Sequence, residues 1–211
     1  MCNEYARRKN LQTLAGAFGQ GGTAPFAWRD GLVPNDLDGK ASVRIRDTAP
    51  IVRLEEDAPR GEMATWAWKG PGGKPVFNFV SEGRDFSRSA RVLVFADGFY
   101  EHTAPAAPKV KLKDRHLFEL VGAPWFWIAG VMREGAFSLL TIAPGPDVAP
   151  FHDRQIVVLP PDLGLSWLTL DRPQGELLRT LPGGALQVTT LRRDGVDLPT
   201  TAKLDGTEPE L

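Results

Sequence analysis

Cys2 has the most distinctive potential chemistry in this sequence, because it is the only cysteine among 211 residues and directly follows Met1. Removal of Met1 would leave a free α-amine and a thiol on the same residue. An unperturbed α-amine titrates near ~8 and a thiol near ~8.5, so both are partly reactive at neutral pH. Such a 1,2-aminothiol adds to an aldehyde through an imine and then closes a thiazolidine ring. The alternative interpretation is an incidental cysteine at a mobile terminus.

Two further segments offer groups for proton transfer. Glu101 ends the apolar run VLVFADGFYE, where desolvation would raise the pKa of its carboxyl toward that of a general acid. His152 precedes the strand-like run QIVVLPP, and its imidazole titrates near neutral pH. Each residue also has an interpretation without a chemical role: Glu101 could be a solvent-facing glutamate, and His152 could be a structural loop histidine. We expect His102 on the opposite strand face from Glu101, and His116 in an exposed turn.

A third group of side chains could bind a substrate. Asn78 interrupts the apolar run PVFNFV, where its amide must be satisfied by a ligand oxygen or by a buried turn. Arg84, Arg88 and Arg91 follow at helical spacing, so a helix there would present them on one face to bind phosphates. A solvated charged face is the alternative for these arginines.

Composition limits the class of protein. With 42% hydrophobic residues the chain can bury the core of one domain. The formal net charge of −1 does not favour a nucleic-acid coat protein, although a local basic patch is compatible with it. One cysteine excludes an intramolecular disulfide and a multi-cysteine zinc site. The polar N-terminal segment and the absence of a run near ~20 apolar residues predict a cytoplasmic protein, nucleoid-associated if bacterial.

Short strands must position these residues, because 22 Gly and 18 Pro punctuate the chain. Strand-like runs occupy 42–47, 51–55, 62–68, 75–80, 90–96, 110–113, 125–132, 137–142, 155–159 and 185–191. Helical segments are expected at 9–18, 86–91 and 174–181. The predicted fold class is α+β, mostly antiparallel β, with a few short helices. A single domain is expected over 1–193, followed by a polar, frayed tail over 194–211.

The order of four sequence elements resembles the SOS response-associated peptidase (SRAP) family. The elements are an N-terminal Met-Cys, an Asn…Glu element at Asn78, ADGFYE ending at Glu101, and HDR beginning at His152. The resemblance extends from residue 2 to about residue 190, nearly the whole chain. Each motif is weak alone, whereas the ordered set with cysteine at position 2 is specific.

The resemblance implies a function and a role for each element. Family members lose the initiator methionine, often by self-processing, and crosslink through a thiazolidine to abasic sites in single-stranded DNA, which shields the lesion during the DNA damage response. By resemblance Cys2 is the nucleophile, and Asn78 holds the N-terminal residue and the opened sugar. Glu101 is the acid and base on the ring oxygen and the amine, and His152 assists ring opening. The family needs no metal or organic cofactor, and any recruiting replication or repair protein is unidentified.

Several positions depart from the family pattern, mostly among the expected DNA contacts. Family members begin with Met-Cys-Gly-Arg, whereas this chain has Asn3 and Glu4 after Met-Cys. In the family pattern N-x-R-x-E, Val80 stands where an arginine is expected. His102 replaces a tryptophan, and Ile156 replaces a proline. We expect a nearby arginine to supply the phosphate contact that is missing at Val80.

The expected DNA-binding side chains are three arginines and two aromatic residues: Arg84, Arg88, Arg154, Trp66 and Trp68. The two tryptophans alternate on one predicted strand and would share a face, where they could stack on unpaired bases. Packing in the core is the alternative for both rings.

Two other functional classes remain open. Cys2, His152 and Asn78 could form a cysteine-type peptidase that acts in trans, with an N-terminal nucleophile. A non-catalytic nucleic-acid-binding or protein-binding module is the second class. A metal enzyme built on Glu101, His152 and Asp153 lacks a recognisable ligand spacing, so no metal is expected.

Overall fold

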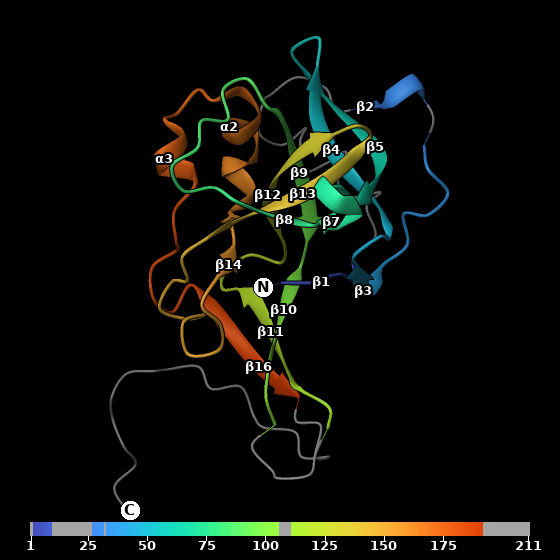
Figure 1. The fold of residues 1–211 in the computed structure, drawn as a ribbon. Coiled ribbons are helices and arrows are strands. Elements are labelled where there is room, and N and C mark those ends of the chain that lie inside the picture. Colours follow the sequence, from blue (N-terminus) through green and yellow to red (C-terminus); the bar gives the residue numbers. More distant parts are fainter. Residues whose placement is uncertain (1, 10–26, 32, 106–110, 192–211) are drawn as a thin grey trace, which may run out of the picture.

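The computed structural model describes residues 2–9, 27–31, 33–105 and 111–191, and these residues form mainly β-strands (Figure 1). The smaller main sheet has five strands. In spatial order they are β16 (Leu186–Leu191), β11 (Asp114–Leu120), β10 (Gly98–Thr103), β1 (Glu4–Arg7) and β3 (Lys40–Arg44). All neighbours in this sheet are antiparallel.

The larger sheet has nine strands and closes on itself. Its main path is β14 (Gln155–Ile156), β13 (Ala136–Ile142), β12 (Phe126–Arg133), β9 (Ala90–Ala96), β4 (Thr48–Glu55), β5 (Ala58–Trp66) and β2 (Ala27–Trp28). Because β13 also pairs in parallel with β5, five of these strands form a ring. Two short strands join this sheet: β8 (Asn78–Val80) pairs in parallel with β13, and β15 (Val158–Leu159) pairs with β12.

Helices are few among the described residues. The α-helices there are α2 (Gly164–Thr169) and α3 (Gln174–Leu177), at the upper left of Figure 1. Short 3₁₀ turns occupy Arg29–Gly31, Pro71–Gly73 and Pro161–Leu163. The strands β6 (Trp68–Lys69) and β7 (Pro75–Val76) pair with each other in a two-stranded ribbon. No helix in the described part of the chain is long and apolar enough to span a membrane. The result is a mostly β fold in one domain with few short helices, as predicted.

One of the connections between the two main sheets is a single extended segment. β9 ends at Ala96 and β10 begins at Gly98, so the chain passes from one sheet into the other with only Asp97 between them (Figure 1). Asp-Gly predicts a turn, but here the chain stays extended and the glycine packs closely against β11. A Cβ at Gly98 would lie 2.6 Å from Leu117 Cδ1, nearer than such carbon atoms approach.

Two apolar clusters fill the interior, and they separate the two tryptophans expected to share a face. Trp66 is fully buried in the first cluster, and Trp68, 8% exposed, belongs to the second. The strand alternation breaks at Ala67, where φ is 97°. The prediction of a shared, base-stacking face is therefore wrong, and core packing accounts for both rings.

Several other predicted elements differ from the structure. The segment 86–91 is a turn followed by β9, so Arg84, Arg88 and Arg91 share no helical face. The strand expected at 110–113 lies instead at β11, and β1, β10 and α2 were missed. The helix expected over 174–181 ends at Leu177. The helix expected over 9–18 and the tail over 194–211 fall mainly or wholly outside the described residues.

Candidate active site

The antiparallel pairing of β1 with β10 places the N-terminal residues beside Glu101. Tyr5 lies opposite Phe99, so the chain traced back from Tyr5 toward Cys2 runs along β10 toward Glu101. Asn78, at the start of β8, donates a hydrogen bond from Nδ2 to the backbone oxygen of Cys2 at 2.7 Å. The structure thereby brings residues from three distant parts of the chain to one place.

His152 completes this group from the segment between β13 and β14. Its Nε2 lies 3.8 Å from Glu101 Oε2. All four predicted reactive residues, Cys2, Asn78, Glu101 and His152, are therefore neighbours in one site. In the part of the chain that the structure describes, no group of three or more His, Cys, Asp or Glu side chains could hold a metal ion.

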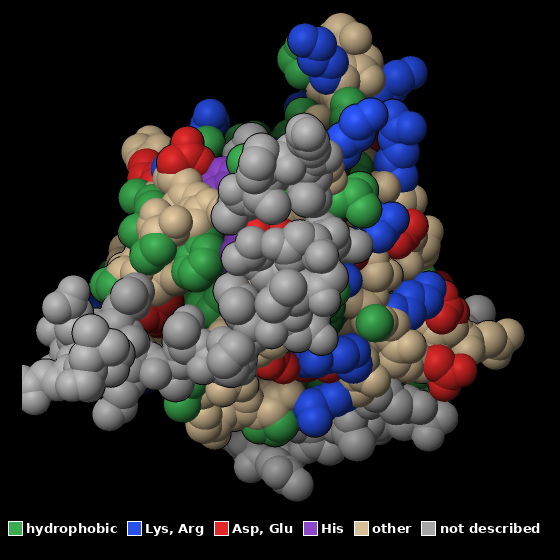
Figure 2. Space-filling view, turned by 90° about the horizontal axis from the view of Figure 1, so that it is seen from below, with side chains coloured by type: hydrophobic (Ala, Val, Ile, Leu, Met, Phe, Trp, Pro, Cys, Tyr) green, Lys and Arg blue, Asp and Glu red, His purple; other side chains and the backbone are tan. Residues whose placement is uncertain are grey.

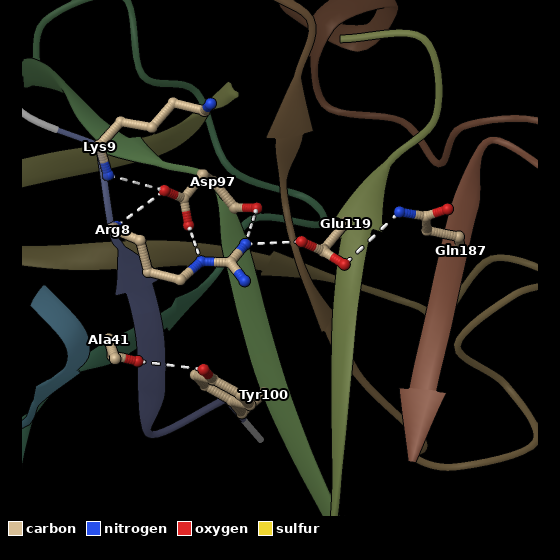
Figure 3. A network of polar contacts seen from close by, with 7 residues as sticks. All are labelled: Arg8, Lys9, Ala41, Asp97, Tyr100, Glu119 and Gln187. Atoms are coloured by element: carbon tan, nitrogen blue, oxygen red, sulfur yellow. Dashed lines mark hydrogen bonds and ion pairs between the residues drawn. The ribbon is translucent and has the colours of Figure 1, made fainter. Parts of the chain in front are cut away.

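The segment that carries Cys2 is anchored by Asp97, between the two main sheets (Figure 3). Its buried carboxylate accepts hydrogen bonds from the backbone N–H of Arg8 at 2.7 Å, from Arg8 Nε at 2.8 Å and from the backbone N–H of Lys9 at 3.0 Å. Arg8 also donates to Glu119 on β11 at 2.6 Å. These bonds fix the end of β1 and so restrict where Cys2 can lie. Sequence reasoning missed this role, because an Asp-Gly pair reads as a turn.

Glu4 ties the start of β1 to the outer face of the small sheet. Glu4 Oε1 accepts a hydrogen bond from Arg115 Nη2 at 2.7 Å and lies 3.5 Å from Arg44 Nε. Ser42 Oγ also donates to this oxygen, and His102 Nε2 lies 3.7 Å from Glu4 Oε2. His102 thus faces Glu4 and away from the site, as strand alternation predicts. The acidic residue that departs from the family start serves here to hold the N-terminal strand.

The Cys2 thiol is a core group rather than part of a mobile terminus. It is 1% exposed and donates a hydrogen bond to the backbone oxygen of Glu4 at 3.2 Å. Burial raises the pKa of the thiol, and the nearby charge of Glu101 raises it further. The expectation of an unperturbed, partly ionised thiol is therefore wrong. This thiol needs a local base before it can react as a thiolate.

Glu101 has the properties of such a base. Its side chain is only 2% exposed, so the solvent-facing alternative is wrong. Burial raises the pKa of its carboxyl to about 7. Both the acid and the carboxylate are therefore populated at neutral pH, and one group can donate a proton in one step and accept it in another.

His152 is held in an orientation that directs Nε2 toward Glu101. Its Nδ1 accepts the backbone N–H of Arg154 at 3.0 Å and lies 2.8 Å from Asp153 Oδ1. Partial burial lowers the pKa of the imidazole, which favours the neutral form.

Asn78 offers one unsatisfied acceptor. Its Nδ2 is used by Cys2, while its Oδ1 is buried and accepts no hydrogen bond from any residue that the structure describes. A buried amide oxygen without a donor is unfavourable unless a ligand supplies one. This observation favours the ligand-binding interpretation of Asn78 over the buried-turn alternative.

Arg154 is engaged in an ion pair with Glu82. Its two terminal nitrogens donate to the two Glu82 oxygens, each at 2.7 Å, and Glu82 Oε1 also accepts the backbone N–H of Ala143 at 2.7 Å. Arg154 lowers the pKa of Glu82 to about 2. The pair joins the His152 segment to the chain just after Asn78 on β8. Sequence reasoning assigned Arg154 to DNA and missed Glu82 as its partner.

The other predicted arginines divide into two kinds. Arg91 donates to the backbone oxygens of Phe86 at 2.7 Å and Leu168 at 2.8 Å, so it is a structural residue. Arg84 and Arg88 are exposed, and the Arg84 guanidinium lies 4.5 Å from the ring centroid of Phe79 on β8. On the face seen from below in Figure 2, Lys and Arg side chains gather along one edge, interspersed with Asp and Glu.

Comparison with known proteins identifies the family. The model of the SOS response associated peptidase (SRAP) family matches residues 79–194, more than half of the chain, and the protein belongs to this family. The matched range contains Glu101 and His152, while Cys2 and Asn78 lie before it. No curated protein matches the sequence.

Solved structures share the fold. A phage-related protein of Bordetella bronchiseptica is similar over 91% of this chain and 95% of its own, with 21% identity and a TM-score of 0.67. Another protein of Bordetella bronchiseptica is similar over 90% of this chain and 100% of its own, with 17% identity and a TM-score of 0.63. A protein of Bacteroides thetaiotaomicron is similar over 92% of this chain and 93% of its own, with 14% identity and a TM-score of 0.63. At these identities the likeness concerns the fold.

Proposed function

We propose that this protein removes its own Met1 and then crosslinks through Cys2 to the aldehyde of an abasic site in single-stranded DNA, which shields the lesion during the DNA damage response. The observation that carries the proposal is that Asn78 and Glu101 meet at Cys2. Asn78 donates a hydrogen bond to the backbone oxygen of Cys2 at 2.7 Å, and the carboxyl of Glu101 has a pKa of about 7. Membership of the SRAP family supports the same class of function.

The first chemical step is ring opening of the abasic sugar. The closed deoxyribose exposes its aldehyde only when the ring oxygen gains a proton and the anomeric hydroxyl loses one. Glu101 and His152, 3.8 Å apart, provide an acid and a base beside the same substrate. The unsatisfied oxygen of Asn78 can accept a hydrogen bond from a sugar hydroxyl.

The second step is condensation with the aminothiol. The Cys2 amine adds to the aldehyde carbon, and loss of water gives an imine. The thiol sulfur then bonds to the imine carbon, while its proton is transferred to the nitrogen through a base. Because burial raises the pKa of the thiol, the carboxylate of Glu101 is the group suited to carry that proton. No oxidant or reductant is needed.

Removal of Met1 uses the same groups. The Cys2 thiol attacks the Met1 carbonyl carbon, the amide nitrogen accepts a proton and leaves, and a thioester forms. Water hydrolyses the thioester, which releases methionine and regenerates the thiol. In self-processing the scissile carbonyl is already joined to Cys2, so no second peptide has to reach this residue, which is 1% exposed.

A denaturing gel tests the proposal. Purified protein, with loss of Met1 verified by intact mass, is incubated with a single-stranded oligonucleotide that carries one abasic site. The matched control oligonucleotide carries a tetrahydrofuran analogue, which cannot open to an aldehyde. We expect a band that survives denaturation with the abasic oligonucleotide alone, at the summed mass less one water. Absence of that band, or an equal band with the analogue, would refute the proposal.

Arg84 and Arg88 are proposed to contact DNA phosphates near Val80. In a Cys2→Ser background, the double variant Arg84→Gln/Arg88→Gln should bind single-stranded DNA more weakly. The slope of log K against log salt should fall by about 1.4, because each phosphate contact on a single strand contributes about 0.7. Arg133→Gln, at the exposed β12–β13 turn, is the matched control and should leave the slope unchanged. An unchanged slope in the double variant would exclude both residues as phosphate contacts.

A further inference from the structure

We propose that His116 is a positioning residue that holds His152 against Glu101 through the ring of Phe151. This inference rests on the proposed crosslinking function and adds to it a residue outside the four reactive ones. It follows from the register of β10 and β11 and from the packing of the segment that carries His152.

His116 lies on the site face of the small sheet. The antiparallel register of β10 and β11 sets His116 directly opposite Glu101 and Phe118 directly opposite Phe99. Residues paired in this way project from the same face of a sheet. His116 is 5% exposed, so the expectation of an exposed turn at this residue is wrong. Its polar neighbours in the sequence conceal a position that faces the interior.

The imidazole of His116 is fixed by a hydrogen bond at each nitrogen. Nε2 lies 2.8 Å from Thr103 Oγ1 on β10, and Nδ1 lies 2.8 Å from Thr190 Oγ1 on β16. Threonine hydroxyls both donate and accept, so a neutral ring satisfies both contacts in either tautomer. The ring therefore bridges three strands and has a defined orientation.

Phe151 transmits this orientation to His152. Its ring centroid lies 4.5 Å from that of His116 and 5.5 Å from that of Phe118, so the side chain packs onto β11. The backbone N–H groups of Phe151 and His152 both donate to Val148 O, at 2.8 and 3.0 Å. This turn makes the two residues move together. A shift of Phe151 must therefore change the approach of His152 Nε2 to Glu101.

Such support matters because proton transfer depends steeply on distance and direction. Groups that act on a substrate must be held within about 0.5 Å of the productive geometry, by neighbours whose own conformations are locked. His152 is on a loop and has only partial burial, so its position depends on contacts such as that of Phe151. A residue that merely filled the core would affect stability without affecting this approach.

Two variants separate positioning from packing. His116→Val removes the ring beneath Phe151, whereas His116→Phe keeps an aromatic ring there. We expect His116→Val to lower the single-turnover crosslinking rate at saturating abasic DNA by about tenfold, with the half-saturating DNA concentration unchanged. His116→Phe should restore the rate to within about threefold of wild type. Val52→Ala, which truncates a buried side chain in the second apolar cluster, controls for the effect of lost stability alone.

A second readout does not depend on crosslinking. Nitrogen NMR of the histidine rings reports the tautomer and titration of His152, and we expect both to change in His116→Val and not in Val52→Ala. Wild-type rate and an unchanged His152 titration in His116→Val would overturn the positioning role while the proposed function stands. If the wild-type protein forms no crosslink, the proposed function fails, and an unchanged His152 spectrum in His116→Val would overturn the positioning role as well.

Discussion

Cys2→Ser is expected to form no denaturation-resistant crosslink with an abasic oligonucleotide under conditions in which the wild-type protein reacts completely. Serine keeps the α-amine and nearly the same shape, but it has no thiol to close a thiazolidine. Once residue 2 is the N-terminus, the imine can still form, so borohydride should trap a reduced adduct in the variant. Retention of Met1, measured by intact mass, is expected in the same variant because the hydroxyl is a poorer nucleophile toward the Met1 carbonyl.

The experiment must distinguish a failure to remove Met1 from a failure to form the crosslink. Both Cys2→Ser and the wild-type chain can be released from a cleavable tag so that residue 2 becomes the N-terminus. A Cys2→Ser chain with a free N-terminus that crosslinks at the wild-type rate without borohydride would exclude the thiol from the linkage.

The buried position of Cys2 also changes the expected stability of its variants. A residue at the N-terminus appears dispensable for folding when only the sequence is considered. Because Cys2 lies in the first apolar cluster, Cys2→Ala should lose about 1 kcal/mol of stability by leaving a small cavity. Cys2→Ser can still donate to the backbone oxygen of Glu4, which makes it the better control for activity.

Glu101→Gln should slow crosslinking by about 10²–10⁴-fold, the range typical for removal of a general acid or base. Glutamine preserves the shape of the side chain but cannot transfer a proton. Removal of Met1 should slow as well, since the same carboxyl serves both reactions. Wild-type rates in this variant would exclude Glu101 from the mechanism.

The same variant should gain stability in a pH-dependent way. Burial holds the pKa of Glu101 at about 7, above the ordinary value of 4.5. Below pH 4.5 the carboxyl is protonated in both states and has no effect. As pH rises from 4.5 to 7 the unfolded chain releases its proton first, so the folded state is progressively destabilised, by about 3 kcal/mol above pH 7.

Urea unfolding at acidic, neutral and alkaline pH measures this effect. Glu101→Gln should be more stable than wild type above pH 7 and equally stable below pH 4.5. Glu82→Gln is a matched control with the opposite sign, because Arg154 lowers the pKa of Glu82 to about 2. That variant should lose stability at neutral pH, and the loss should disappear as pH falls toward 2. Equal stability of wild type and Glu101→Gln above neutral pH would contradict the raised pKa.

The sequence alone determined the reactive residue types and the strands with strong apolar patterns. A cysteine at position 2 becomes an aminothiol once Met1 is removed, whatever the fold, and Glu101 and His152 each adjoin an apolar run that predicts burial nearby. Runs such as Ala90–Ala96 and Phe137–Ile142 need no partner to be recognised as strands, because their side chains carry the pattern.

Only the tertiary structure decided where polar residues are buried. β1, with the sequence EYAR, has no apolar pattern and is buried because β10 and β3 pair with it on both sides. His116 is satisfied by two threonines from other strands, and the partly buried Arg154 is paired with Glu82, 72 positions earlier in the chain. A polar side chain can be buried when its hydrogen-bond partners are supplied, and those partners come from segments that the local sequence does not reveal.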